Sequence, residues 1–298
     1  MNIFKLTFFF LSLNIFGQKP VIEVNYLVTD DNSVVFTYVK SAPGSYTISF
    51  KFDWLENASM ERTTFVLKDN SGNLFTLRPK NKDGRINFSY STTIRRGVVN
   101  PKTDPNFVYL LPFSKDKKVK VFEKTYAYNE FFGTEVPKNW KAYLFQPESA
   151  DTVYASRKGV VISLEDRFES DTVSVFNSQQ NMIKIEHPDG TYSEYQGFKK
   201  DGIHVVIGQT VYPMMPLGLI MEKSGSLSFM VYYNIKVDQN QEENLQSYKS
   251  RVECITPLFY TGEGITKLNE KATYTADYDE KTVLQELSKK EIKNLNKK

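Results

Sequence analysis

The clearest pattern in the chain is a series of short runs in which apolar side chains recur at every second position. In residues 182–187, Ile183 and Ile185 alternate with the charged Lys184 and Glu186, a period of two that is typical of a half-buried strand. The residues at 188–190, Pro-Asp-Gly, predict a turn, because proline presets φ and glycine accepts a positive φ. Residues 191–195 are therefore predicted to return as the partner strand. Further strands are predicted near 204–212 and 227–235.

Residues 18–122 carry the same alternation at short and fairly even spacing. The apolar runs are Val21–Val28, Val34–Val39, Tyr46–Phe52, Thr63–Leu67, Leu74–Leu77, Ile86–Tyr90, Phe107–Leu111 and Val119–Phe122. Turn residues such as Pro43-Gly44 separate several of them. About seven short strands at this spacing are typical of an immunoglobulin-like β-sandwich, which we predict for residues 18–122.

The two ends of the chain depart from this alternation. Residues 1–17 combine Lys5 with an apolar run of about ten residues, which predicts a secretory signal peptide; a retained membrane anchor is the alternative. Near the other end, residues 280–296 place Leu284, Leu287 and Leu295 close to one face, which predicts a helix capped by Asp279. This helix either packs on its own domain or docks on a partner.

Composition supports a mainly β protein and excludes some partners. The chain has 298 residues, of which 40% are hydrophobic and 14% aromatic, enough for one large or two ordinary domains. A formal net charge of +3 gives no strong field, so no nucleic-acid partner is expected. The one cysteine, Cys254, excludes an internal disulfide and is expected to be a small buried side chain. After the leader, no apolar run approaches the roughly 20 residues that a membrane-spanning helix needs.

Residues 125–237 contain short motifs in a fixed order. They are TVYASRKGVV at 152–161, HPDGT at 187–191 with Tyr195, Val205 with Gly208 and Val211, Leu217-Gly218, and Leu227 with Phe229. This series resembles the sheet core of the lysostaphin/LytM-type zinc metallopeptidases, which cut peptidoglycan cross-bridges. The resemblance implies a lysostaphin-type antiparallel β-sheet domain at 123–240, followed by an extension at 241–298 that holds a strand and the helix at 280–296.

The resemblance also identifies the positions where the family has metal ligands and a catalytic histidine. The family's zinc-binding aspartate falls on Leu144, and three of its histidines fall on Gly197, Ser226 and Ser228. No histidine precedes His187, so the family's first zinc-binding histidine is missing as well. Because a zinc hydrolase needs about three protein ligands, the resemblance implies a pseudo-active site that has lost its metal and its catalysis. No zinc or other cofactor is expected.

Other chemistry has little support in the residues. His187 is expected to be structural and His204 to lie on an edge strand, and two histidines without a carboxylate do not make a zinc site. The chain has no GxSxG motif and no glycine-rich phosphate loop. Ser114 and Lys117 match SxxK, a pattern that is common by chance. The carboxylates at 165–171 are expected to belong to a solvated loop and not to an acid/base pair.

The feature that could survive is the peptide-binding groove implied by the resemblance. Tyr143, Arg157 and Tyr195 are expected to line it, since aromatic and arginine side chains are typical of such contacts. The alternative is that the groove has filled in and these residues pack. We therefore expect a secreted or periplasmic, non-catalytic protein that binds peptidoglycan or an envelope protein and regulates a cell-wall hydrolase. A peptidoglycan metalloendopeptidase with a relocated metal site and a purely structural envelope subunit are the alternatives.

Overall fold

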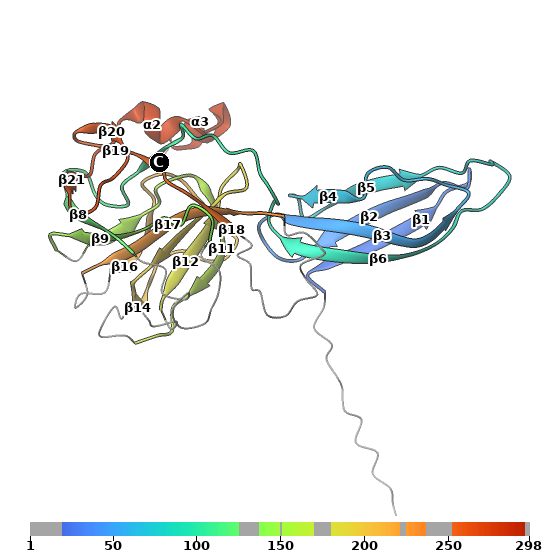
Figure 1. The fold of residues 1–298 in the computed structure, drawn as a ribbon, viewed down its shortest axis with the longest axis horizontal. Helices are drawn as coiled ribbons and strands as arrows, with labels where there is room; N and C mark the ends of the chain where they lie inside the picture. Colours follow the sequence, from blue (N-terminus) through green and yellow to red (C-terminus); the bar gives the residue numbers. More distant parts are fainter. Residues whose placement is uncertain are drawn as a thin grey trace, which may run out of the picture.

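The computed structural model describes residues 20–124, 137–149, 151–169, 180–220, 225–236 and 252–295. The leader expected at 1–17 lies outside these ranges. The described chain is built mainly from β-strands in several sheets, with two short helices near its C-terminal end (Figure 1). The expected mainly β fold class is thereby confirmed. No helix in the described ranges is long and apolar enough to cross a membrane.

The first module is a sandwich of two three-stranded antiparallel sheets, ordered β1-β2-β5 and β4-β3-β6. Its strands are β1 (Ile22–Val28), β2 (Val34–Lys40), β3 (Tyr46–Glu56), β4 (Thr64–Leu67), β5 (Ser71–Leu77) and β6 (Asn87–Arg96). Alternation positions the core, because β2 buries Val34, Phe36 and Tyr38 on one face. The rings of Phe36 and Phe50 pack against each other between the two sheets, with 5.9 Å between their centroids. The immunoglobulin-like character of this sandwich stays a prediction.

The second module is built around a nine-stranded sheet. The strands run in the order β15-β11-β12-β13-β17-β9-β8-β21, and β18 also pairs with β17. They are β8 (Lys118–Glu123), β9 (Ala142–Pro147), β11 (Gly159–Glu165), β12 (Met182–Glu186), β13 (Tyr192–Gln196), β15 (Thr210–Val211), β17 (Leu227–Asn234), β18 (Val252–Ile255) and β21 (Thr273–Thr275). The hairpin predicted around the turn at 188–190 is present, since Ile183 pairs with Tyr195 and Glu186 with Tyr192.

Two small sheets complete the second module. One contains β10 (Thr152–Tyr154), β14 (Phe198–Ile203) and β16 (Pro216–Ile220); the other contains β7 (Val108–Leu110), β19 (Leu258–Thr261) and β20 (Gly264–Thr266). Side chains from all three sheets meet in one cluster, which we call the main core. Phe229 of the large sheet, Phe198 of β14 and Phe259 of β19 are all buried in it.

The domain boundaries expected at residues 122 and 240 are wrong. Tyr109, Val119 and Val121 are buried in the main core, and β8 pairs with both β9 and β21. The change from the first core to the second therefore lies between Arg96 and β7. The C-terminal residues likewise belong to the second module, because β18, β19 and β21 supply strands to its sheets. Alternation fixes the faces of a strand but not its partner, which is why both boundaries were misplaced.

The expected C-terminal helix is confirmed, but it is not continuous over 280–296, since the structure has α2 (Glu280–Leu284) and α3 (Lys289–Leu295) with a break between them. Asp279 does cap the first helix, because its carboxylate accepts a hydrogen bond from the Thr282 amide at 2.7 Å. At the break, the amide of Glu291 donates to the Ser288 hydroxyl and the Ser288 amide donates to the Glu291 carboxylate. This reciprocal capping box starts a second helix at Ser288 and explains the interruption.

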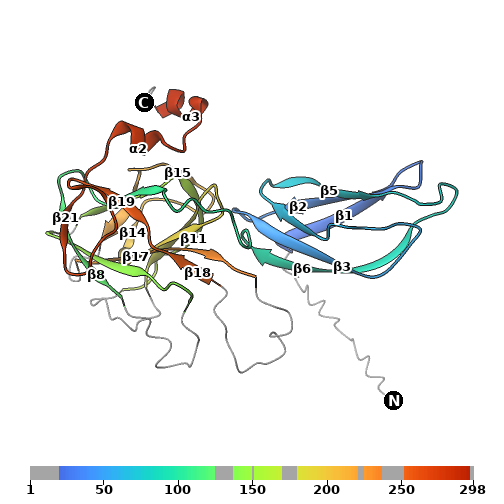
Figure 2. The same cartoon turned by 45° about the horizontal axis from the view of Figure 1, so that its top comes forward.

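The two modules lie end to end (Figure 2). Specific polar contacts join them. The Glu186 carboxylate accepts hydrogen bonds from the amide and the hydroxyl of Ser45. The Arg96 guanidinium donates to the carbonyl of Ile162 at 2.8 Å, and the Asn234 side chain donates to the carbonyl of Arg96 at 2.9 Å. These bonds connect Ser45, which directly precedes β3, and the end of β6 with the large sheet.

Candidate functional site

The two faces of the nine-stranded sheet have different environments. In β17, Leu227, Phe229 and Val231 are buried in the main core. Successive side chains of a strand point to opposite faces, so Ser228 and Met230 lie on the other side. We call this second side the outer face. It is marked by a row of paired residues across four strands, formed by Gln196, Ser228, Leu144 and Phe122.

The four positions of the expected pseudo-active site lie next to one another on and beside this row. Ser228 pairs directly with Leu144, and Cα atoms of such antiparallel partners are about 4.5–5.5 Å apart. Gly197 follows Gln196, the other partner of Ser228, and its backbone approaches the carbonyl of Ser226. Ser226 and Ser228 are 4% and 7% exposed. The register thus gathers neutral side chains where the family has ligands and a catalytic histidine.

Gly197 has a backbone that accounts for its side chain. Its φ is +109°, outside the left-handed region that other residues tolerate. A Cβ atom at this position would lie 2.6 Å from the carbonyl oxygen of Ser226. A histidine here would be strained by both the main-chain conformation and the close contact.

The expected groove-lining role of Tyr143, Tyr195 and Arg157 is wrong. Tyr143 and Tyr195 are 1% and 0% exposed and lie in the main core, where the Tyr195 hydroxyl accepts a hydrogen bond from the Ser156 amide at 2.9 Å. The physical reason is parity: Tyr143 precedes Leu144 in β9 and must face the opposite side. Arg157 is 3% exposed and belongs to a separate network, described below.

Lys124 is the residue on the outer face that the sequence reasoning missed. Its Nζ donates a hydrogen bond to the Ser228 hydroxyl at 3.2 Å. Its main chain is fixed on both sides, because its amide donates to the carbonyl of Ala142 at 2.9 Å and its carbonyl accepts from the Trp140 indole at 2.8 Å. Burial lowers the pKa of Lys124, and the charge of Glu194 partly opposes that shift. Alternation with Val119 and Val121 would have placed it here, had β8 been assigned to the large sheet.

Glu194 lies on β13, two residues before Gln196, and its carboxylate already has three contacts within the protein. It accepts hydrogen bonds from the side-chain amide of Gln196 at 2.7 Å and from the Tyr232 hydroxyl at 3.1 Å, and it pairs with Lys184 at 3.2 Å. Burial, followed by the charge of Glu194, raises the pKa of Tyr232 well above its usual value. Tyr232 therefore stays a neutral donor, and the charge of Glu194 is balanced by Lys184.

The residues of the outer face do not fit a zinc ion. Leu144 and Gly197 have no ligand atoms, and serine hydroxyls are poor substitutes for imidazole. Within the described ranges, no group of three or more His, Cys, Asp or Glu side chains could hold a metal. The expected lack of a zinc cofactor stays a prediction.

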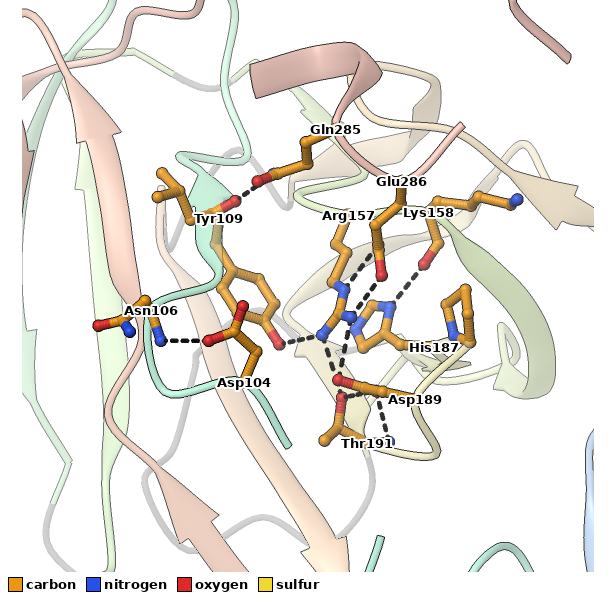
Figure 3. A network of polar contacts seen from close by, with 12 residues as sticks. Asp104, Asn106, Tyr109, Arg157, Lys158, His187, Asp189, Thr191, Gln285 and Glu286 are labelled. Atoms are coloured by element: carbon orange, nitrogen blue, oxygen red, sulfur yellow. Dashed lines mark hydrogen bonds and ion pairs between the residues drawn. The ribbon is translucent and has the colours of Figure 1, made fainter. Parts of the chain in front are cut away.

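A second polar cluster, at the end of the large sheet, is centred on Arg157 (Figure 3). The guanidinium donates to both carboxylate oxygens of Glu286 at 2.8 and 2.5 Å, and it pairs with Asp189 at 3.0 Å. It also donates to the Tyr109 hydroxyl at 2.9 Å and lies 3.6 Å from the ring centroid of Phe107. We call this cluster, together with His187, the Arg157 network.

His187 is held neutral inside the Arg157 network. Its Nδ1 lies 2.7 Å from the carbonyl of Lys158, and because a carbonyl only accepts, Nδ1 carries the proton. The ring is 2% exposed. Burial, followed by the charge of Arg157, lowers the pKa of His187 to about 3. A neutral ring with this fixed tautomer positions the turn that precedes β13. The other histidine, His204, is exposed beyond the end of β14.

The C-terminal helices are attached to the second module through the same region. Glu286 follows α2 and binds Arg157, while Glu291 of α3 pairs with Lys158 at 2.7 Å. Hydrogen bonds from Lys158, the larger cause, and from Ser288 lower the pKa of Glu291 to about 2. Of the two alternatives for the C-terminal helix, the structure shows packing on its own module.

Comparison with known proteins gives distant structural likenesses. No protein-family model matches, and no curated protein matches. Among solved structures, the chain is similar to the M23 metalloprotease pseudoalterin from the deep sea, with 14% identity over 58% of this chain and 96% of that chain and a TM-score of 0.32. A zinc-containing peptidase from Vibrio cholerae has 15% identity over 67% and 52%, with a TM-score of 0.25. Helicobacter pylori Csd3 has 9% identity over 89% and 77%, with a TM-score of 0.30. All three TM-scores are below 0.5.

Proposed function

We propose that this protein is a non-catalytic envelope protein that binds peptidoglycan, or a partner protein that acts on it, through the outer face of its large sheet. The observation that carries the proposal is the direct pairing of Ser228 with Leu144, beside Gly197. These are the positions at which the family resemblance places a metal ligand or a catalytic residue. A sheet that keeps this register without ligand atoms supports binding in place of hydrolysis. Secretion or export to the periplasm, expected from residues 1–17, is part of the proposal.

The strand geometry supports a binding role for this face. Ser228 and Gln196 offer neutral hydrogen-bonding groups beside the apolar Leu144 and Phe122, and Lys124 adds a cation. A small number of polar groups among apolar side chains is the usual composition of a site that orients a ligand. Control of a cell-wall hydrolase is the regulatory form of the same proposal, in which the partner occupies this face.

The test is a pull-down of purified peptidoglycan sacculi by the full chain without its predicted leader. We expect binding that persists in chelator, no cleavage of cross-bridges, and less than about 0.1 zinc per chain by elemental analysis, since four-coordinate zinc sites need several ligands. Leu144→Glu, which adds a charge to the outer face, should abolish binding. The matched control is Leu219→Glu on β16, where the leucine is 38% exposed.

Two outcomes would overturn the proposal. If Leu144→Glu and Leu219→Glu bind sacculi equally well, the outer face is not the binding surface. If the protein cuts cross-bridges and chelator stops it, the chain is a metalloendopeptidase with a relocated metal site. A protein that binds neither sacculi nor any envelope protein after crosslinking in intact cells would be a purely structural subunit.

A further inference from the structure

We propose that Lys124 and Ser228 together bind a carboxylate group of a peptide that lies along the outer face. This inference rests on the proposed function, because it names the chemical group that the binding face recognises. The carboxylate could be the C-terminus of the peptide or an acidic side chain, and the experiment below separates the two sources.

The first step in the argument is the geometry of the two donors. Nζ of Lys124 and the Ser228 hydroxyl are 3.2 Å apart, so each can reach one oxygen of a shared carboxylate. The lysine ammonium has three donors, and the bond to Ser228 uses one of them. The main chain of Lys124 is fixed by its bonds to Ala142 and Trp140. The amine is therefore pre-positioned beside the row of Gln196, Ser228, Leu144 and Phe122.

The second step is the balance of charge on the outer face. Within the described ranges, Lys124 and Lys184 are the cations beside Glu194, and Glu194 is paired with Lys184. No described carboxylate lies within ion-pair distance of Lys124. Among the described residues, the half-buried charge of Lys124 therefore has no contacting counter-charge. A half-buried charge without a partner is unfavourable, and a bound anion would relieve it.

The third step concerns the neighbours along β8. Lys118 and Lys120 are exposed on the same side of this strand, and neither forms an ion pair with a described residue. The Lys120 amine lies 5.2 Å from the centroid of the Phe122 ring. The positive side of the outer face is therefore a stripe along β8 that attracts an anionic ligand toward Lys124.

The fourth step selects a carboxylate among anions. Of these lysines, Lys124 is the one that is half-buried beside the row, and one buried positive charge matches a monoanion. A phosphate dianion is often bound by arginine pairs or by a cradle of main-chain amides. Leu144 and Phe122 border the site, and apolar neighbours suit the main chain and methyl groups of a peptide better than a free, strongly hydrated ion. An extended peptide with one carboxylate at this point fits both properties.

The test uses calorimetric titration of the full chain with four synthetic stem tetrapeptides of composition Ala, Glu, Lys, Ala. One has both carboxylates free, one is amidated at its C-terminus, one is amidated at the Glu side chain, and one at both. We expect the doubly amidated peptide to bind at least tenfold more weakly than the free acid. The single amide that shows the same loss identifies which carboxylate Lys124 binds.

Variants connect this loss to the two residues. Lys124→Met and Ser228→Ala should each weaken binding of the free acid about tenfold and should leave binding of the doubly amidated peptide unchanged. Lys124→Arg keeps the charge and should retain most of the affinity. Lys51→Met is the matched control, because Lys51 is exposed on β3 of the sandwich and away from the outer face, and it should change affinity less than about threefold. A thermal melt of each variant checks that it remains folded.

The outcomes separate this inference from the proposed function. If sacculi bind but amidation and Lys124→Met change nothing, the carboxylate site is wrong and the proposed function stands. If sacculi do not bind while the free acid binds in a Lys124-dependent way, the carboxylate site stands and peptidoglycan is the wrong ligand. If none of the four peptides binds, the inference is overturned.

Discussion

The outer face and the Arg157 network lie in the same module and use the same kinds of side chain to opposite effect. In the Arg157 network, one guanidinium contacts Glu286, Asp189 and Tyr109, so its charge is fully compensated. On the outer face, Lys124 contacts a neutral hydroxyl, and the nearby Glu194 is paired with Lys184. Arg157 is paired with carboxylates inside the protein, whereas the ammonium group of Lys124 keeps N–H donors that a ligand can use.

This difference shows which polar clusters hold a fold together and which are available for binding. The Arg157 network joins the turn at 188–190, the strand β7 and the segment after α2, three parts distant in sequence. The side chains of the outer face connect no further segments, because main-chain pairing already holds its four strands together. Removing a residue should therefore cost stability in the first case and ligand binding in the second. Four measurements test this comparison.

The largest effect is expected from Arg157→Met. The substitution leaves Asp189 and Glu286 without their buried partner, which typically destabilises a protein by about 3–5 kcal/mol. Denaturant unfolding measures the loss, and faster proteolysis after α2 would report release of the C-terminal helices. Arg167→Met is the control, because Arg167 pairs with Glu165 at 73% side-chain exposure and should cost less than about 1 kcal/mol. Equal costs for the two variants would contradict the role of the network.

A smaller effect is expected from acid, acting through His187. Its folded pKa of about 3 lies below the usual 6.5, so below pH 6.5 the unfolded chain takes up a proton that the folded chain refuses. Stability should therefore fall as the pH drops, by about 2 kcal/mol between pH 7 and 5, at 1.36 kcal/mol for each pH unit below 6.5. Asp189, whose pKa is lowered, adds a further loss only below about pH 4.

The pH dependence can be assigned by comparing unfolding curves of the wild type and His187→Gln at pH 7 and 5. Glutamine can keep a hydrogen bond to the Lys158 carbonyl but does not titrate. The variant should start less stable at pH 7 and lose almost nothing on going to pH 5. A wild-type protein whose stability is the same at both values would show that the ring is accessible to protons in the folded state.

Gly197→Ala should cost about 1–2 kcal/mol, since φ at +109° strains any residue with a Cβ atom and that atom would meet the Ser226 carbonyl. Gly225→Ala is the matched comparison, because its φ of +54° lies in the left-handed region and no atom lies within 4 Å of an added Cβ. Thermal unfolding measures both. If the two substitutions cost the same, the close approach at Gly197 does not set its identity.

The smallest effect is expected from Lys124→Met in the absence of ligand. Because burial disfavours the charged amine and no described carboxylate contacts it, its removal should change stability by less than about 1 kcal/mol in either direction. Chemical denaturation at neutral pH measures this. If Lys124→Met lowered the free energy of unfolding as much as Arg157→Met, Lys124 would have a structural role and the two clusters would not differ in function.

The parts of the fold that depend on local pattern were predictable. The hairpin around residues 188–190 follows from alternation and turn chemistry, and the capping role of Asp279 follows from its place before an amphipathic run. The membership of β8 was not predictable in this way, because residues 118–123 alternate equally well in either module. Its partners β9 and β21 are chosen by long-range packing in the main core.

The candidate site was predictable in part. The resemblance placed Leu144, Gly197, Ser226 and Ser228, and the register brings them together. The assignment of Tyr143 to the same face contradicted strand parity and could have been rejected from sequence alone. The role of Lys124 could not be predicted without assigning β8 to the large sheet. The pairing of Arg157 with Glu286 could not be predicted either, because the two residues are far apart in sequence and Glu286 lies where the C-terminal helix is interrupted.

The pairing of β8 with β21 also affects how the chain folds during synthesis and which fragments of it can fold. Lys120 finds its partner Thr273 about 150 residues later, a separation that raises contact order and slows folding. During synthesis, which begins at the N-terminus, the sandwich can fold early. The second module can fold only after nearly all of the remaining sequence has been made. A fragment ending at residue 240 would expose the free edge of β8 and lack β19 from the main core. The second module should therefore be expressed from about residue 97 to 295 as one piece.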